Sequence, residues 1–227
     1  MGAEMMNEIL IVDHLYKSFG KENILRDIHF SLEKGCIAGI TGRNGSGKTV
    51  LMKCILGFLR PEQGSVTVFG KMIGKDCDFA ENTGMIIETP GFIDTESGIS
   101  NLRYLRRSTG KNPKSLLACE EAMDLVGLDP GNKKPVSKYS LGMRQRLGLA
   151  QALMDDPDLL ILDEPMNGLD NSGVEQIRTL LLDLRERGKT ILLCSHNPLD
   201  IDLLCDVRYA MNSGVMTLVN DTFSKKS

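Results

Sequence analysis

The fold of this chain is decided by one stretch, Cys36-Ile37-Ala38-Gly39-Ile40-Thr41-Gly42-Arg43-Asn44-Gly45-Ser46-Gly47-Lys48-Thr49, with an apolar run after it. Residues 42–49 fit the phosphate-loop pattern G-x-x-x-x-G-K-[ST] at every fixed position. Residues 36–40 before the loop predict a buried strand, and residues 50–56 after it predict an apolar-faced helix. This setting favours a nucleoside triphosphate site over the alternative, a glycine-rich turn that binds nothing.

The chemistry of the loop assigns roles to its residues. Its glycines let the backbone curl so that successive N–H groups point at phosphate oxygens, and the positive end of the following helix adds to this attraction. We expect Lys48 to reach the β- and γ-phosphates and the hydroxyl of Thr49 to hold Mg²⁺. The expected nucleotide-binding residues here are Gly42, Arg43, Asn44, Gly45, Ser46, Gly47, Lys48 and Thr49.

The composition narrows the class of protein. With 227 residues, 41% hydrophobic and 25% charged, the chain suits one large globular domain, or one domain with a subdomain. A net charge of −3 gives no basic field for nucleic acid. We expect no signal peptide and no transmembrane segment, because the start lacks basic residues and no apolar run is long enough. Six cysteines without a C-x-x-C pair argue against a zinc site among them and suggest a reducing cytosol.

The periodicity predicts a change of structure along the chain. Short apolar stretches at 9–12 and 28–32, with a turn-like segment at 20–23, predict antiparallel strands, and residues 65–69 predict another. Residues from about 80 to 156 predict mostly helices, one beginning near Asn112-Pro113 and closed by Gly127, and the next ending at Pro157.

The last third of the sequence alternates strands and helices. Residues 159–162 and 190–194 predict buried strands, and residues 174–187 predict a helix with Gly188 just after it. Continuous apolar strands alternating with helices indicate a parallel sheet covered on both faces, with ligands beyond the carboxyl ends of its strands. We therefore expect the phosphate loop, Asp163-Glu164 and Ser195-His196 to converge on one edge.

Two of these motifs carry groups suited to hydrolysis. Asp163 could hold Mg²⁺ opposite Thr49, and Glu164 could polarise a water for attack on the γ-phosphorus. His196 is favoured as a contact to the γ-phosphate or to that water. The alternatives are an acidic pair in a loop or cap and a structural histidine.

A further motif lies in the helical middle, at 140–146. Ser140 is a natural N-cap, and with exposed N–H groups and Gly142 it forms a candidate anion site. From the residues alone, an ordinary capped helix that binds nothing explains this segment as well as an anion site does.

Taken together, these motifs resemble the ATP-binding subunit of ATP-binding cassette (ABC) transporters over essentially the whole chain. Residues 42–49 match Walker A, 139–145 the ABC signature and 159–164 Walker B, while 167–170, ending in Asp170, look like the D-loop and His196 looks like the switch histidine. The order and spacing of the set make it much more specific than Walker A alone.

The resemblance implies a fold and an assembly. The fold is an α/β, RecA-like P-loop NTPase core with a parallel sheet, an antiparallel β-subdomain (about 5–35 and 60–78) and a helical subdomain (about 89–156). Two such domains dimerise head to tail, so that Ser140 and Gly142 of one contact the γ-phosphate held by the other. Phe19 is placed to stack on adenine, with Tyr16 as the runner-up and two core residues as the alternative.

The chain departs from the family pattern at several positions. Leu141 and Met143 replace a glycine and a glutamine of the signature, and Val50 replaces a hydroxyl residue that often contacts the α-phosphate. Glu88 stands where most members have glutamine, and a carboxylate there remains an oxygen ligand for Mg²⁺ near the nucleotide. The chain resembles the branch of the family that exports, or confers immunity to, bacitracin and lantibiotics. The resemblance lies in Glu88, in the Thr-Pro-Gly-Phe that follows it and in the Tyr-Ser-Leu-Gly-Met signature.

The function that the resemblance implies is an ATPase that drives transport. ATP and Mg²⁺ are the implied cofactors, and the partners are a second ABC domain, in a homodimer or heterodimer, and a separate transmembrane permease that docks around residues 88–107. The chain would lie peripherally at the cytoplasmic face of the membrane and bind no nucleic acid. The alternatives are a non-transport ABC-type ATPase and a P-loop phosphotransferase.

Overall fold

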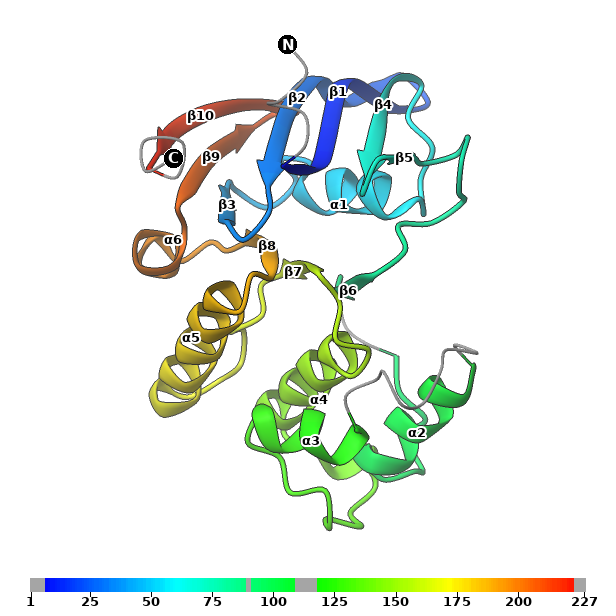
Figure 1. The fold of residues 1–227 in the computed structure, drawn as a ribbon, viewed down its shortest axis with the longest axis vertical. Coiled ribbons are helices and arrows are strands. Elements are labelled where there is room, and N and C mark those ends of the chain that lie inside the picture. Colours follow the sequence, from blue (N-terminus) through cyan, green and yellow to red (C-terminus); the bar gives the residue numbers. More distant parts are fainter. Residues whose placement is uncertain (1–6, 89–90, 109–117, 223–227) are drawn as a thin grey trace. The chain divides into compact units, whose positions relative to one another are not determined.

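The computed structural model describes residues 7–88, 91–108 and 118–222. The chain divides into two compact units (Figure 1). Unit 1 comprises Met1–Glu81 and Leu184–Ser227, and unit 2 comprises Asn82–Asp183.

Unit 1 contains an antiparallel sheet with the strand order β2-β1-β4-β5. Its strands are β1 (Glu8–Phe19), β2 (Glu22–Glu33), β4 (Gln63–Val68) and β5 (Lys71–Met72). In β2 the buried Ile28, Phe30 and Leu32 alternate with less buried polar residues, whereas β1 begins with a continuous apolar run, Ile9 to Val12. The predicted antiparallel strands at 9–12 and 28–32 are thus confirmed as parts of β1 and β2, and the strand predicted at 65–69 is β4.

A second set of strands in unit 1 carries the phosphate loop. β3 (Ile37–Thr41) pairs in parallel with β8 (Thr190–Cys194) and with β9 (Val207–Asn212), and β10 (Val215–Asp221) pairs antiparallel with β9. β8 is buried along its whole length and β3 at four of its five residues, as expected for parallel strands covered on both faces. Helices α1 (Lys48–Leu56) and α6 (Pro198–Leu204) complete this unit.

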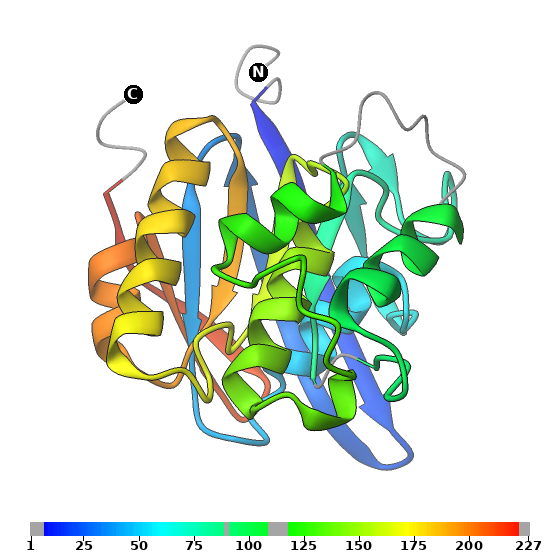
Figure 2. The same cartoon turned by 90° about the horizontal axis from the view of Figure 1, so that it is seen from below.

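Unit 2 combines a parallel pair of strands with a group of helices. β6 (Thr83–Ile86) pairs in parallel with β7 (Leu159–Asp163). The helices are α2 (Gly98–Ser108), α3 (Cys119–Leu125), α4 (Leu141–Leu153), the 3-10 turn η3 (Val136–Lys138) and α5 (Asn171–Glu186), whose last turn falls in unit 1. Figure 2 shows α2, α3 and α4 close together in green, consistent with the mostly helical middle predicted from the sequence.

Local signals explain where several helices begin and end. α5 begins three residues before the predicted start at 174, because Asp170 Oδ1 accepts a 2.9 Å hydrogen bond from Gly173 N and caps the helix. Gly127 and Gly188 follow α3 and α5 with φ of 73° and 83°. The predicted start at Asn112-Pro113 lies outside the described residues, and the division into three subdomains stays a prediction.

The cysteines and the lengths of the helices can be compared with what the composition predicted. All six cysteines are free, five of them buried. No helix in the described ranges is long and apolar enough to cross a membrane.

Candidate nucleotide-binding site

The phosphate loop joins β3 to α1 in unit 1. β3 ends at Thr41 and α1 begins at Lys48, with Gly47 at the N-cap in a left-handed conformation (φ 109°). A Cβ at Gly47 would lie 3.0 Å from side-chain carbons of Leu25 and Met211, so this position needs glycine for space as well as for backbone conformation. No side chain caps α1 at Gly47, which suits an N-terminus that receives an anion.

Polar groups of the loop lie at its interior. Lys48 is buried, and its Nζ donates hydrogen bonds to the carbonyl oxygens of Gly42 at 2.7 Å and Arg43 at 3.2 Å. The buried Ser46 Oγ has no hydrogen-bond partner among the described residues. A buried hydroxyl without a partner is costly, and a phosphate oxygen is a partner of the right chemistry. The loop therefore fits the phosphates of a nucleotide.

Two buried cysteines belong to the strand–loop–helix segment, Cys36 just before β3 and Cys54 near the end of α1. Burial raises the pKa of Cys36 to about 12 and that of Cys54 to about 11. Both therefore stay protonated at neutral pH and pack as small hydrophobic side chains.

His196 follows the strand next to the one that leads into the loop. The parallel pairing of β3 with β8 matches Ile40 to Cys194, so the phosphate loop and the Ser195-His196 segment lie at the same edge of the sheet in unit 1. Ser195 Oγ donates a 3.1 Å hydrogen bond to Asp200 Oδ2 and accepts one from Asn197 N. These bonds hold the segment while His196 itself is exposed.

The two candidates for the adenine contact differ in exposure. Phe19, the last residue of β1, is 50% exposed, and Lys17 Nζ lies 5.4 Å from the centroid of its ring. Tyr16 is half-buried. Phe19 is therefore a surface aromatic residue with a ring face within reach of a ligand, and its stacking on adenine stays a prediction.

Unit 2 holds the predicted carboxylates. Asp163 is the last residue of β7, and Glu164 follows it with φ 51°. The Glu164 carbonyl oxygen accepts a 3.1 Å hydrogen bond from Nε2 of Gln145, a signature residue to which the sequence analysis assigned no role of its own. Glu88 follows β6 with φ 56° and is exposed. Since β6 and β7 run in parallel with Ile86 opposite Leu162, Glu88 and the Asp163-Glu164 pair lie at the same end of this strand pair.

The signature segment of unit 2 forms the predicted capped helix. Ser140 is the N-cap of α4, and its Oγ accepts a 3.2 Å hydrogen bond from Met143 N. A Cβ at Gly142 would lie 3.0 Å from the Gly168 carbonyl oxygen, so the signature packs closely against the predicted D-loop. Asp170 of that loop caps α5, as described above.

The predicted site residues thus form two groups. Unit 1 holds the phosphate loop, Phe19 and His196, and unit 2 holds the carboxylates and the signature. In unit 1 the phosphate loop and His196 lie at the same end of parallel strands, and in unit 2 Glu88 and the Asp163-Glu164 pair do so. The meeting of the two groups stays a prediction.

Unit 2 also has a pocket of about 400 Å³, on the surface predicted to dock a partner. Its lining comes from the segment before α2 and from α2 itself: Gly91, Phe92, Ile93, Asn101, Tyr104, Leu105 and Ser108. Ile93 is 50% exposed and Phe92 is half-buried, while Pro90 lies outside the described residues. The sequence did not predict the role of Asn101, which is buried and fastens the segment by hydrogen bonds to Ile93 N at 2.7 Å and Ile93 O at 3.2 Å.

Comparison with known proteins places these features in a family. Residues 25–167 match the family model described as ABC transporter. The bacitracin transport ATP-binding protein BcrA of Enterococcus faecalis is 41% identical over 212 residues, covering 92% of this chain and 68% of that protein. The lantibiotic transport ATP-binding protein SrtF of Streptococcus pyogenes is 34% identical over 198 residues, covering 87% and 84%. The solved dimeric structure of MJ0796, a bacterial ABC transporter cassette, matches with a TM-score of 0.81 at 19% identity, covering 93% of this chain and 99% of that one.

The chain belongs to the ABC transporter family. It is an ATP-binding subunit of such a transporter and an ATPase, with the RecA-like α/β fold expected from the sequence. The resemblance to the bacitracin and lantibiotic branch is confirmed by the relatives. ABC ATPase domains dimerise and work with transmembrane components, which is the general form of the partners predicted above.

Proposed function

We propose that this chain powers the export of a peptide antibiotic, or a related amphipathic compound, through a separate transmembrane permease. The observation that carries the proposal is the 41% identity to a bacitracin transport ATP-binding protein. Glu88 adds to it, because the sequence resembles the same branch of the family at this position. Proteins named for bacitracin and for lantibiotic transport are both among its relatives.

The phosphate loop is the proposed ATP site. The backbone N–H groups of residues 42–49 and the N-terminus of α1 would receive the phosphates. Lys48 Nζ would exchange the carbonyls of Gly42 and Arg43 for phosphate oxygens, a stronger, charge-assisted pairing. Val50, in the first turn of α1, would lie beside the phosphates, and the exposed ring of Phe19 would stack on adenine.

The residues proposed for Mg²⁺ are all oxygen donors. Thr49 would supply a hydroxyl, and Asp163 and Glu88 would supply carboxylates, the ligands that Mg²⁺ prefers. When bound, the ion neutralises charge on the phosphates.

Hydrolysis is assigned to residues after β7 and β8. Glu164 would polarise the attacking water, and His196 would contact that water or the γ-phosphate. In an ATP-bound dimer, Ser140 and Gly142 of the second domain would bind the γ-phosphate, with Asp170 near the same interface. Because ATP then binds the closed dimer better than the open one, binding closes the pair and hydrolysis reopens it.

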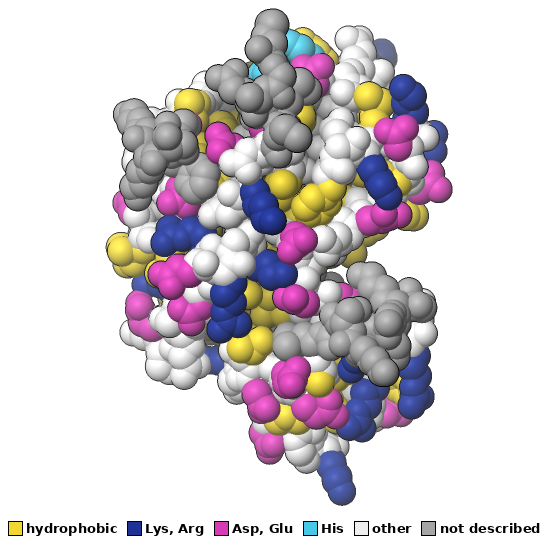
Figure 3. Space-filling view, in the orientation of Figure 1, with side chains coloured by type: hydrophobic (Ala, Val, Ile, Leu, Met, Phe, Trp, Pro, Cys, Tyr) yellow, Lys and Arg dark blue, Asp and Glu magenta, His cyan; other side chains and the backbone are white. Residues whose placement is uncertain are grey.

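The pocket beside α2 is the proposed docking site for the permease. Its apolar lining, with Ile93 and Tyr104 about half exposed, suits an amphipathic segment of a partner. Helix α2 carries Arg103, Arg106 and Arg107, which form a basic rim, with Arg103 paired to Glu120 of α3, and basic side chains gather over this helix (Figure 3). A permease segment with apolar residues for the pocket and acidic residues for this rim would fit best.

The first experiment measures oligomeric state. A Glu164→Gln variant, which should bind ATP without hydrolysing it, is analysed by size-exclusion chromatography with light scattering, with and without ATP. We expect a dimer only with ATP, and a monomer when Lys48→Ala is added. Nucleotide binding without a dimer would contradict a homodimeric clamp and lead to co-purification with a second cassette or the permease.

The second experiment tests transport. The chain and its permease are expressed in a bacitracin-sensitive host, with Glu164→Gln as the matched control, and bacitracin and lantibiotic tolerance are measured. Raised tolerance with the active protein alone supports export. ATP hydrolysis that neither antibiotic nor permease changes would instead favour a non-transport ATPase, and phosphate transfer to a small acceptor would favour a phosphotransferase.

The third experiment tests the docking site. Ile93→Asp should abolish co-purification with the permease but leave ATP-dependent dimerisation intact. Leu125→Asp is the matched control, because Leu125 is 37% exposed on α3 and does not line the pocket. Equal capture of the permease by both variants would refute the assignment.

A further inference from the structure

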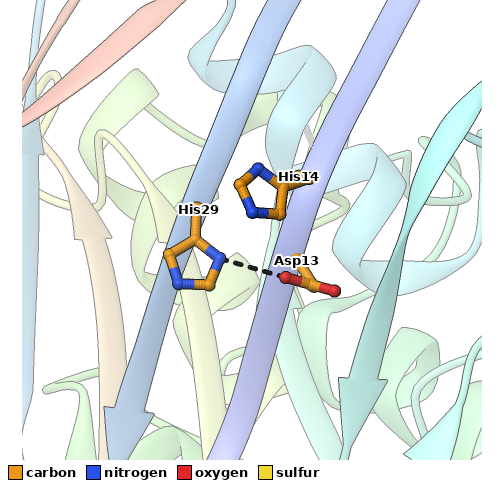
Figure 4. Close-up of side chains that lie close together, drawn as sticks. All are labelled: Asp13, His14 and His29. Atoms are coloured by element: carbon orange, nitrogen blue, oxygen red, sulfur yellow. Dashed lines mark ion pairs between the residues drawn. The ribbon is translucent and has the colours of Figure 1, made fainter.

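A cluster of two histidines and an aspartate lies on the exposed face of the antiparallel sheet in unit 1. Asp13 and His14 come from β1 and His29 from β2. Each offers one ligand atom, and these three atoms all lie within 4.8 Å of one another. Figure 4 shows the three side chains directed toward one another across the two strands. None of them belongs to the proposed nucleotide site.

A β-bulge creates this juxtaposition. Val12 pairs with Phe30 and Leu15 with Ile28, so that two residues of β1, Asp13 and His14, stand opposite the single residue His29. In a regular strand two consecutive side chains point to opposite faces, whereas a bulge re-aims one of them. His14 has the left-handed φ of 45° that accompanies this distortion.

The neighbouring strand is adapted to the bulge. A Cβ at Gly64 of β4 would overlap the carbonyl oxygens of Asp13 and His14. Glycine at position 64 therefore lets β4 pass close to the bulged backbone, and the cluster is built into three adjacent strands.

A carboxylate fixes the orientation of His14. Its Nδ1 lies 2.6 Å from Asp27 Oδ1, and its other ring nitrogen, Nε2, points toward His29 and Asp13 (Figure 4). Metal-binding histidines commonly have this arrangement, with one ring nitrogen held by a carboxylate and the other directed at the ion.

The spacing of the other two groups suits a tetrahedral ion. His29 Nδ1 lies 3.2 Å from Asp13 Oδ1. Two ligands of a tetrahedral zinc ion, each about 2.0–2.1 Å from the metal, lie about 3.3 Å apart. The rings of His14 and His29 are stacked with centroids 5.0 Å apart, so the two imidazoles lie side by side on the sheet.

We propose that Asp13, His14 and His29 form a surface site for a divalent transition-metal ion, with Zn²⁺ as its best match and Asp27 as the positioning residue. Two imidazoles and a carboxylate favour Zn²⁺ over Mg²⁺ or Ca²⁺, which prefer oxygen ligands alone. The side chains of His14, His29 and Asp13 are 66%, 60% and 54% exposed, so an ion reaches them from solvent and water can fill the fourth position.

The test is calorimetric titration of the full chain with ZnCl₂, without a histidine tag and without nucleotide. We expect one ion per chain with a dissociation constant of about 1–50 µM, and a loss of at least about tenfold in His14→Ala and in His29→Ala. Asp27→Asn should keep the stoichiometry and weaken binding about 10-fold. Because these side chains are exposed, the variants should remain folded, which urea unfolding checks.

Two matched controls exclude other zinc ligands. His196→Ala removes a histidine outside the cluster, and Cys77→Ser removes the cysteine that is not buried; both should bind Zn²⁺ as the parent does. Co²⁺ gives a second readout, since a tetrahedral site adds visible absorption bands that His29→Ala should lose. Parent-like Zn²⁺ affinity in His14→Ala and His29→Ala, or no saturable binding below about 100 µM, would overturn the proposal and leave two exposed histidine–aspartate ion pairs.

Discussion

Ser140 has a structural role that the structure displays and a chemical role that we propose, and two substitutions separate them. Its Oγ caps α4 by accepting a hydrogen bond from Met143 N. The same hydroxyl is the proposed contact to the γ-phosphate in a dimer. Ser140→Ala removes both interactions. Ser140→Asp keeps an oxygen that caps the helix but places a negative charge where a phosphate would lie.

The expected magnitudes differ enough to be told apart. The cap bond is 3.2 Å long and Ser140 is exposed, so Ser140→Ala should lower the free energy of unfolding by about 1 kcal/mol. Ser140→Asp should stay within about 0.5 kcal/mol of the parent. A hydrogen bond to a charged group contributes roughly 1.5–3 kcal/mol, so ATP hydrolysis should fall roughly 10- to 150-fold in Ser140→Ala and at least as far in Ser140→Asp.

The assays are urea unfolding followed by far-ultraviolet circular dichroism, since the chain has no tryptophan, and steady-state phosphate release. ATP-dependent dimerisation in the Glu164→Gln background gives a third readout. Parent-like hydrolysis by Ser140→Asp, with Ser140→Ala less stable by the amount above, would show that Ser140 is only a helix cap and would refute the phosphate contact.

Three further predictions concern other parts of the chain. Gly84→Ala should lower the free energy of unfolding in urea by more than about 2 kcal/mol, because the new Cβ would overlap the carbonyl oxygen of Ala152 in α4. Gly91 has open space around it, so Gly91→Ala should change the free energy of unfolding by less than about 0.5 kcal/mol in the same assay. Glu88→Ala should uncouple hydrolysis from transport more than it weakens ATP binding, as judged by nucleotide affinity and by antibiotic tolerance; a collapse of affinity with coupling intact would contradict this. The hydrogen bond and charge of Asp27 raise the pKa of His14 above its ordinary value, so Asp27→Asn should lower that pKa in an NMR titration. In the parent chain, the stability contributed by the His14–Asp27 pair should be lost as the pH rises through the pKa of folded His14.

The elements that the sequence predicted well are those whose signal is local. The strand at 190–194 has the predicted bounds because every residue of it is apolar or β-branched and buried. The phosphate loop was predicted from its own residues, and the parallel pairing of β3 with β8 then accounts for His196 at the same sheet edge. The phosphate-loop motif and the order of the strands were therefore sufficient to predict that the loop and His196 lie at one sheet edge.

Features that depend on distant partners escaped prediction. β10 is mostly exposed, with no alternation of buried and exposed residues to mark a strand, and it forms by pairing with β9. The bulge at Asp13-His14 depends on the register between β1 and β2 and on Gly64 of a third strand. The bonds of Asn101 that fasten the segment before α2 likewise have no signature in the sequence.

The two glutamates that follow the parallel strands of unit 2 share a backbone conformation that lowers stability. Glu88 and Glu164 follow β6 and β7 with φ of 56° and 51°, a left-handed region that costs a non-glycine residue about 1 kcal/mol or more. Glycine would adopt this conformation without that cost, so fold stability alone does not explain a glutamate at either position. We infer that the side chains contribute something that glycine lacks. At the carboxyl ends of two parallel strands, a carboxylate would lie at the sheet edge where α/β proteins bind their ligands.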